Sequence, residues 1–221
     1  ALASVPGSDP NLFVNGISSE QYQTLQDDPD QPLFNRALSG QYPPGSTIKP
    51  LMALAGLEYK EVTPATQVFC QGWYSLPGDI HRYRDWKKEG HGATNVTSAI
   101  MHSCDVYFYS LAHGLGIDRM NKYLGYFGLG KKTGIDLPGE LAGLLPSRDW
   151  NRAARHEVWY PGETLITGIG QGYTLVTPLQ LAEATAILAN RGTIIQPHIV
   201  HETRSSGGAE FFPQTGTPQG K

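Results

Sequence analysis

The sequence is poor in cysteine, in long apolar runs and in excess charge of either sign. Its 221 residues include two cysteines, and 17 Lys and Arg stand against 20 Asp and Glu, for a formal net charge of −3. No window approaches the roughly 20 apolar residues of a membrane helix, and no signal-peptide pattern opens the chain. With this charge balance the chain has no excess of basic residues to attract phosphate groups, which argues against nucleic acid as a partner.

The composition that remains is globular, with 39% hydrophobic and 10% aromatic residues. The length suits one large domain or two small lobes with a core. The chain opens without Met, in the strand-like "ALASV", and we expect it to be a piece of a longer protein. We predict a single domain over residues 1–221, with a flexible or shortened segment over 204–221, which is rich in Gly, Ser, Pro and Gln.

Apolar spacing and capping residues predict helices over residues 46–60, 94–103, 105–114, 117–127 and 178–191. The third of these closes on Gly114. The last begins at a capping box of Thr177 and Gln180, with Pro178 at the first helical position, and stops before Gly192.

Strand-like stretches are shorter than the predicted helices. They lie at residues 66–70 and 72–76, and as a pair bent at Pro197 within residues 192–203. A long polar stretch over residues 6–32 is typical of a loop with one helical turn near "SEQYQTL". Because no parallel βαβ alternation is visible, the mixture predicts an α+β domain that carries a helical lobe.

The stretch "YPPGSTIKP" places Ser46 three residues before Lys49, at the start of the first predicted helix. A serine at this position is commonly a helix cap, because its hydroxyl accepts a bond from a backbone N–H. It is also placed for chemistry, since a lysine at i+3 returns to the same face and a partly buried lysine can take a proton from a serine. The helix N-terminus would stabilise the negative charge that results. The motif alone allows both interpretations.

A second polar group lies at the junction between two predicted helices, where "HSCDVYFY" holds Ser103 and Asp105. Ser103 is available to pass a proton between Lys49 and a leaving amine. The set S-x-x-K, S-D-N and K-T-G is a signature of penicillin-recognising serine enzymes, and here the order and separation of the first two motifs fit, with Asp in place of Asn. The candidate catalytic residues are therefore Ser46, Lys49, Ser103 and Asp105.

Several longer stretches carry a resemblance to a known family, namely "DPNLF", "NRALSGQYPPGSTIKP", "RYRDWKKEGHG", "TGIDLPGE" and "GIGQGYTLVTPLQLA". Together they resemble the transpeptidase domain of class B penicillin-binding proteins, most closely the elongation-specific members, over residues 1 to about 200. The resemblance implies the penicillin-binding/β-lactamase-like transpeptidase fold, an antiparallel sheet flanked by helices with a helical lobe, in which the sheet can be incomplete in this chain. S-x-D is the form of the second motif in this branch, so Asp105 fits the resemblance.

The same resemblance implies an activity, which is the cross-linking of peptidoglycan during cell elongation. Ser46 would attack the D-Ala-D-Ala end of a stem peptide and carry the acyl group, Lys49 would be the base, and Ser103 with Asp105 would relay the proton and bind substrate. β-Lactams would acylate Ser46 because they mimic the dipeptide. The implied location is the periplasmic side of the bacterial inner membrane, on a single-pass anchor outside this chain, with a membrane glycosyltransferase as partner.

The third motif is not obvious in the sequence. A literal K-T-G occurs at Lys132–Gly134, but the resemblance places this stretch in a loop away from the catalytic strand, with Lys132 solvated. The motif belongs on a strand after the helix over 178–191, where only "PQTGTPQGK" is similar, with Gln214 in place of Lys. A substrate-binding role for Thr215, Gly216 and Thr217 therefore stays open.

The two cysteines raise the question of a metal. Cys70, Asp85, His91 and Cys104 are all metal-ligand types, and thiolates with an imidazole favour zinc in a closed tetrahedral site. A disulfide between the cysteines and two buried free thiols are the alternatives that the residues leave open. The resemblance implies one structural zinc on these four residues, with His102 as the substitute ligand if one of them is wrong.

Two other functions compete with the transpeptidase. A hydrolase of the same fold, a carboxypeptidase or β-lactamase, needs a base that brings water onto the acyl-enzyme, and Glu140 in "PGELAG" is the residue that this reading would use. A non-catalytic penicillin-sensing module would keep the fold and S-x-x-K without acceptor chemistry. The response to a penicillin separates the three.

Overall fold

The computed structural model describes residues 2–204, 211–213 and 218–220, and it divides into two compact units. One unit comprises residues 1–42, 131–142 and 177–221, and the other comprises residues 43–130 and 143–176. The single domain predicted over residues 1–221 stays a prediction.

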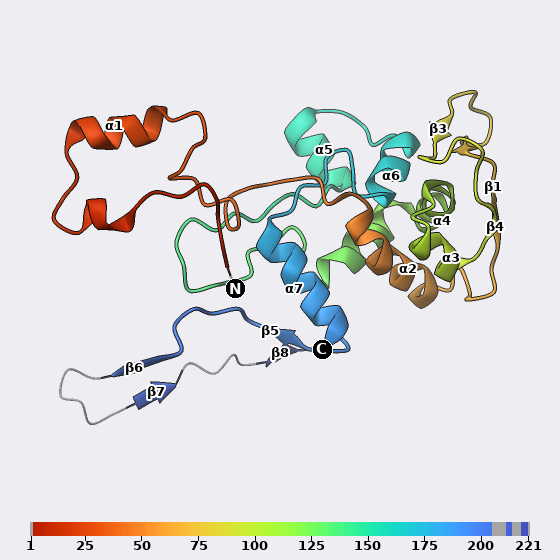
Figure 1. The fold of residues 1–221 in the computed structure, drawn as a ribbon. Coiled ribbons are helices and arrows are strands. Elements are labelled where there is room, and N and C mark those ends of the chain that lie inside the picture. Colours follow the sequence, from red (N-terminus) through yellow and green to blue (C-terminus); the bar gives the residue numbers. More distant parts are fainter. Residues whose placement is uncertain (1, 205–210, 214–217, 221) are drawn as a thin grey trace. The chain divides into compact units, whose positions relative to one another are not determined.

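The unit of residues 43–130 and 143–176 is built around one long helix (Figure 1). Its elements are a 3-10 turn, η2 (Gly45–Ile48), and the helices α2 (Lys49–Glu58), α3 (Val96–Met101), α4 (Asp105–Gly125), α5 (Arg148–Arg155) and α6 (Pro161–Gly168). Helix α4 packs against α2 and α6. The core between them is apolar, with Met52, Phe108 and Leu165 fully buried, so the helices hold the η2–α2 and α3–α4 junctions in fixed positions.

Helix α4 joins two helices that the sequence predicts separately. The predicted break at Gly114 is wrong, because the backbone leaves helical geometry at Gly116 instead, where φ is 71° and ψ is 159°. Only glycine adopts such a positive φ without a steric cost. Gly114 stays helical, and a Cβ there would lie 2.2 Å from a side-chain oxygen of Glu61.

Two antiparallel strand pairs complete this unit. β1 (Val68–Cys70) pairs with β4 (Gly92–Thr94), and β2 (Trp73–Tyr74) pairs with β3 (Tyr83–Arg84). The registers set Cys70 opposite Gly92 and Trp73 opposite Arg84. The strands predicted at 66–70 and 72–76 are confirmed. Their pairing brings the Cys70 end of one strand next to His91, which the sequence places 21 residues later.

The other unit contains a 3-10 turn η1 (Pro10–Phe13), helices α1 (Ser19–Asp27) and α7 (Pro178–Ala189), and strands β5 (Ile194–Ile195), β6 (Glu202–Arg204), β7 (Phe211–Pro213) and β8 (Pro218–Gly220). The capping box predicted for α7 is present, because Thr177 Oγ1 accepts from the Gln180 backbone N–H and Gln180 accepts from that of Thr177. The strand pair predicted around Pro197 is wrong in its partners, since β5 pairs with β8 and β6 pairs with β7.

Two predictions near the N-terminus are corrected. The expected strand in "ALASV" is wrong for the described residues 2–5, where Ser4 is held by its hydroxyl instead, which donates to Phe34 O and accepts from the Arg36 N–H. The single helical turn expected near "SEQYQTL" is the nine-residue helix α1, which a capping box of Ser18 and Gln21 begins.

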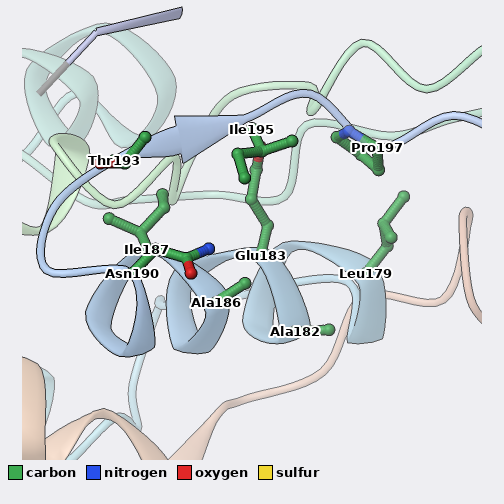
Figure 2. Close-up of a pocket in the computed structure, with 9 residues that line it drawn as sticks. All are labelled: Leu179, Ala182, Glu183, Ala186, Ile187, Asn190, Thr193, Ile195 and Pro197. Carbon is green, nitrogen blue, oxygen red and sulfur yellow. The ribbon is translucent and has the colours of Figure 1, made fainter. Parts of the chain in front are cut away.

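A groove of about 220 Å³ runs between α7 and β5 (Figure 2). Its walls are apolar, with Leu179, Ile187 and Ile195 among them, and Glu183 rises from α7 toward β5 as its one acidic side chain. Burial first, and then the charge of Glu140, raise the pKa of Glu183 from 4.5 to about 7. This carboxyl therefore keeps its proton to a higher pH than an exposed glutamate does.

The segment predicted to be flexible, 204–221, is described only in part. Arg204 ends β6, and residues 211–213 and 218–220 form β7 and β8. Thr215, Gly216 and Thr217 lie outside the described residues. Across the part of the chain that is described, no helix is long and apolar enough to cross a membrane. Helices combined with small antiparallel sheets confirm the predicted α+β class.

Candidate active site

Ser46 lies in the 3-10 turn η2, directly before α2. The cap residues of η2 and α2 are Pro44 and Ile48, and neither helix start has a side-chain capping bond. Ser46 is therefore not a helix cap. Pro50 occupies the first turn of α2, where the missing N–H costs no helical hydrogen bond.

Lys49 begins α2 and is buried, with 1% of the residue exposed. Its Nζ donates to Ser103 O at 2.9 Å and to Ser103 Oγ at 3.1 Å, and it forms an ion pair with Asp105 Oδ1 at 2.6 Å. The Phe108 ring lies 5.3 Å from the ammonium and covers it as a cation–π partner. Every donor direction of the ammonium is therefore taken inside the protein.

Ser103 joins Lys49 to Ser46. Its hydroxyl donates to Ser46 Oγ at 2.9 Å while it accepts from Lys49 Nζ. The residue lies in the short link between α3 and α4 and has a φ of 53°, in the left-handed region that serine rarely adopts. This backbone turns both its carbonyl and its hydroxyl toward Lys49, and the conformation costs roughly 1–2 kcal/mol, which the surrounding contacts must offset.

The four candidate catalytic residues thus form one continuous polar chain, from Ser46 through Ser103 to Lys49 and Asp105. The expected direct contact between Ser46 and Lys49 is not among the hydrogen bonds of the described residues, so the geometric argument from i+3 spacing is wrong in detail. Ser103 bridges the two because Lys49 Nζ directs its three donors to Ser103 O, Ser103 Oγ and Asp105 Oδ1. The chain can move a proton between the outermost serine and the lysine.

The loop before Ser46 is held by a glycine contact that sequence reasoning did not identify. Gly45 N donates to Gly170 O at 2.8 Å. A Cβ on Gly170 would lie 2.2 Å from Gly45 O, and the φ of Gly170 is +72°. Both facts require glycine at this position. The closely spaced glycines of "GIGQG" are the signal that could have indicated such a close backbone approach.

The four predicted metal ligands also come together. One ligand atom from each of Cys70, Asp85, His91 and Cys104 lies within 4.8 Å of all the others. Cys70 Sγ is 3.5 Å from both Asp85 Oδ2 and His91 Nδ1, and His91 Nδ1 is 3.6 Å from Asp85 Oδ1. Both cysteines are free thiols, so the disulfide alternative is not seen.

The electrostatics of this cluster suit a cation. Burial first, together with Cys70 and Asp85, raises the pKa of the Cys104 thiol to about 12. At Asp85 burial alone would raise the pKa, but hydrogen bonds from the Lys87 and Val106 backbone outweigh it, and the pKa of Asp85 lies below its usual value. A cation at the centre would supply the positive charge that a buried thiolate and carboxylate together need.

Comparison with known proteins identifies the family of the chain. The family model described as penicillin binding protein transpeptidase domain matches residues 1–220. The chain belongs to this family. It is 51% identical over 221 residues to the peptidoglycan D,D-transpeptidase MrdA of Acinetobacter baumannii, and 48% identical over 207 residues, 94% of the chain, to the protein of the same name from Escherichia coli K12. The chain spans about a third of the length of these relatives, 32% and 33%.

Solved structures of the penicillin-binding family show the same fold. Pseudomonas aeruginosa PBP2, solved in complex with WCK 5153, superposes with a TM-score of 0.88 at 51% identity, covering 98% of this chain and 49% of that one. A chain from a peptidoglycan synthase complex, from a study of how polymerisation and crosslinking are coordinated, gives 0.81 at 37% identity, covering 97% and 37%. Penicillin-binding protein A of M. tuberculosis, as its imipenem acyl-enzyme, gives 0.84 at 26% identity, covering 99% and 49%. The predicted resemblance to penicillin-binding transpeptidases is confirmed.

The literal K-T-G of this transpeptidase-family chain lies in a loop, as predicted. The Thr133 N–H and hydroxyl each donate to Glu140 Oε1 at 2.6 Å, and the Gly134 N–H donates to Glu140 Oε2 at 3.1 Å, while Lys132 is exposed. Glu140 is buried with both oxygens occupied. Because both Glu140 oxygens accept hydrogen bonds within this loop, the structure gives no support to Glu140 as the base of a hydrolase.

His102 does not belong to the metal cluster. Its ring stacks on that of His91 at 6.1 Å, its side chain is exposed, and its carbonyl accepts from Trp86 Nε1 at 3.1 Å. Sequence reasoning did not identify this contact of Trp86, although Trp86 lies between Asp85 and His91 in the sequence. The four ligands predicted first come together without the substitute.

Proposed function

We propose that this protein is a peptidoglycan D,D-transpeptidase that cross-links stem peptides through an acyl-enzyme on Ser46 during cell elongation. The observation that carries the proposal is the polar chain from Ser46 through Ser103 to Lys49 and Asp105. This row of hydrogen-bonded side chains lies in a protein that is about half identical to proteins named peptidoglycan D,D-transpeptidase. A more distant relative forms an acyl-enzyme with imipenem.

Acylation begins when Ser46 Oγ attacks the carbonyl of the D-Ala-D-Ala bond. Its proton passes to Ser103, whose own proton passes to Lys49, because a hydroxyl can donate and accept at once. Lys49 must first release a proton in order to accept one, and Asp105 Oδ1 at 2.6 Å is the acceptor within reach. At rest, the Asp105 carboxylate stabilises the charged ammonium of Lys49. The ammonium in turn orients Ser103 by donating to its hydroxyl.

The second half of the reaction uses the same chain in reverse. In the resting orientation Lys49 donates to Ser103 and Ser103 donates to Ser46, and this direction delivers a proton to the departing amine of D-Ala as the C–N bond breaks. The acceptor amine then attacks the ester on Ser46, its proton leaves along the chain, and the serine hydroxyl is restored. Microscopic reversibility requires one set of groups to serve both steps.

The location and partners that we propose follow from relatives. Proteins named MrdA act on peptidoglycan, and a chain 37% identical to this one belongs to a peptidoglycan synthase complex that coordinates polymerisation with crosslinking. We infer that this domain works in the periplasm, in a protein anchored once in the inner membrane, beside a membrane glycosyltransferase. Stem peptides are the substrates, and β-lactams are inhibitors that acylate Ser46.

A β-lactam tests this function directly. Intact-protein mass after exposure to penicillin should rise by the mass of one β-lactam in wild type and should not rise in Ser46→Ala. The adduct should persist for hours. Rapid return to the unmodified mass would instead indicate a hydrolase, and a stable adduct without any cross-linking of D-Ala-D-Ala peptides would indicate a sensing module.

We further propose that Cys70, Asp85, His91 and Cys104 hold one structural zinc per chain. The donor set supports zinc, since thiolates and an imidazole with a carboxylate are its usual ligands at about 2.0–2.3 Å. A tetrahedron of such bonds has edges of roughly 3.3–3.8 Å, and the distances between Cys70 Sγ, His91 Nδ1 and the nearer Asp85 oxygen in each case are 3.5–3.6 Å. The ion would be structural, because four protein ligands leave no position for water.

Zinc also explains an otherwise costly arrangement. Cys70, Cys104 and Asp85 are buried, and a thiolate or carboxylate in such a place needs a compensating positive charge. Elemental analysis of protein purified without added zinc should give about one zinc per chain. A preparation that is folded, contains no metal and keeps both thiols reactive would contradict the site.

A further inference from the structure

A small pocket lined by cations and indole rings lies in the strand region next to the metal cluster. Its volume is about 220 Å³, and its walls include Trp73, Arg82, Arg84, Trp86 and Lys88. None of these side chains takes part in the polar chain of the active site or in the metal cluster.

The local backbone explains why these residues share one wall. Arg82 and Arg84 lie two positions apart at β3, where an extended backbone puts alternate side chains on one side, and Trp86 and Lys88 follow in the bend and turn after this strand. The β2–β3 register sets Trp73 opposite Arg84. The Arg82 guanidinium stacks on the Trp73 ring at 4.2 Å, which fixes both groups at the pocket wall.

The charge in this pocket is not balanced from within. Arg82, Arg84 and Lys88 form no ion pair in the part of the chain that the structure describes, and all three are exposed. The carboxylate of Asp85 also borders the pocket, but its oxygens accept from the Lys87 and Val106 backbone. In a chain with a net charge of −3, this pocket presents a local excess of positive charge to solvent.

The pocket is connected to the catalytic junction. Trp86, which is 64% exposed, donates from Nε1 to His102 O at 3.1 Å. His102 directly precedes Ser103, whose hydroxyl contacts Ser46. A ligand held against the Trp86 ring therefore lies one hydrogen bond and one peptide unit from the proton relay.

We propose that this pocket binds a free carboxylate of the peptidoglycan strand that is being cross-linked and holds that strand beside the catalytic junction. Guanidinium groups bind carboxylates in a planar, bidentate manner, and the two indole rings offer flat apolar faces to the neighbouring sugar or peptide atoms. The substrate identity rests on the proposed function. Three cations around a small pocket fit one or two carboxylates better than the extended rows of phosphates in a nucleic acid, which need a long basic surface.

Co-sedimentation with purified peptidoglycan sacculi tests the pocket. The full chain should bind native sacculi, and the double variant Arg82→Ala/Arg84→Ala should bind at least about fivefold more weakly, as expected for losing two exposed charge contacts. The matched control is Lys131→Ala/Lys132→Ala, which removes the same charge from two exposed lysines outside the pocket and should bind like wild type. Sacculi whose carboxylates have been amidated should bind wild type as weakly as native sacculi bind the pocket variant.

Every other outcome overturns the proposal. Equal binding of native sacculi by wild type and the pocket variant would mean that the cations bind nothing there, and unchanged binding after amidation would exclude a carboxylate. Binding to phosphatidylglycerol vesicles that is lost in the pocket variant, without such a loss on sacculi, would assign the pocket to an anionic membrane. If the double variant misfolds, Lys88→Gln gives the same comparison with one charge.

Penicillin acylation of Ser46, measured in parallel, separates the two proposals. If wild type is acylated but binding does not depend on Arg82 and Arg84, only the pocket assignment fails. If binding depends on them but Ser46 is never acylated, the proposed transpeptidase function fails while the carboxylate pocket stands.

Discussion

Ser103 combines two properties that substitution can separate. Its hydroxyl joins Ser46 to Lys49, and its backbone has a φ of 53°. The hydroxyl serves the reaction, whereas the backbone conformation is a cost that any residue with a Cβ carries.

Ser103→Gly and Ser103→Ala therefore form a matched pair. Both lack the hydroxyl, so penicillin acylation should slow by about a hundredfold in each, the scale of a lost acid–base group. The glycine variant should nevertheless be more stable than the alanine variant by about 1 kcal/mol, because only the alanine retains the left-handed strain. Acylation rates and urea unfolding check the two effects. Unequal acylation rates would mean that the backbone, and not the hydroxyl, limits the reaction.

Gly170→Ala tests the support of the nucleophile. The new Cβ would lie 2.2 Å from Gly45 O, so the turn that carries Ser46 must shift, and a displacement of about 1 Å can cost a hundredfold in rate. We expect penicillin acylation to fall at least tenfold. Gly78→Ala is the control, because Gly78 has a similar φ of +78° but no atom within 4 Å of the added Cβ. It should lose stability without losing the acylation rate.

At the residue scale, sequence reasoning found the candidate residues but not their exact contacts. Motif spacing identified Ser46, Lys49, Ser103 and Asp105, and the structure brings them together. Spacing could not show that Ser103 stands between the nucleophile and the lysine, because this depends on the left-handed backbone of Ser103 and on the contacts that hold Lys49 Nζ. A left-handed backbone at serine has no residue-level signature, since serine rarely adopts it.

Helix α7 carries the one strongly perturbed carboxyl of its groove. The pKa of Glu183 rises to about 7 through burial and the charge of Glu140. The folded state then binds a proton more tightly than the unfolded state, so the contribution of Glu183 to stability is present in full below about pH 4.5 and is lost as the pH rises through 7.

Glu183→Gln should remove this dependence on pH. The variant should unfold at a higher temperature than wild type at pH 8 and show little difference at pH 5, as measured by thermal melting monitored by circular dichroism. Glu89→Gln, an exposed glutamate in a turn outside any helix, is the control and should change neither value. Equal gains at both pH values would show that Gln improves packing without any linkage to protons.

The sequence predicted elements where apolar periodicity or capping was strong. Helices α2 and α7 and strands β1 and β2 follow from these signals. Helix α5 was missed because it has no apolar stripe, with Asn151 as its one buried residue, and α6 was missed because "PGETLITG" begins and ends with weak helix formers. Glu163, three residues after Tyr160, was the signal in the sequence for the start of α6, and in the structure its carboxylate accepts from the Tyr160 N–H.

At the scale of the whole molecule, the four residues proposed to bind zinc come from β1, from the loop between β3 and β4 and from the start of α4. A strong chelator, by removing the proposed zinc, should lower the melting temperature by at least about 5 °C, since metal-binding energy is folding energy. Cys70→Ser should reproduce most of this loss, whereas Glu89→Gln, an exposed carboxylate in the same loop, should not. Identical melting with and without chelator would contradict a structural metal.

The α+β class and the family were within reach of the sequence, because long stretches such as "NRALSGQYPPGSTIKP" resemble the family and a family model matches residues 1–220. The partners of the strands were not, since pairing depends on contacts far apart in the sequence. The division into two units, in which residues 131–142 and 177–221 join the N-terminal 42 residues, follows from tertiary contacts that no local pattern indicates.

The most direct test of the central claim is the position of the penicillin adduct. After brief exposure to penicillin, tryptic digestion should place the added mass on the peptide spanning residues 37–60, since the Lys49–Pro50 bond resists trypsin. Fragmentation should locate it on Ser46, and Ser46→Ala should carry no adduct on this peptide. An adduct on any other residue, or an equal adduct in Ser46→Ala, would contradict the assignment of Ser46 as the nucleophile.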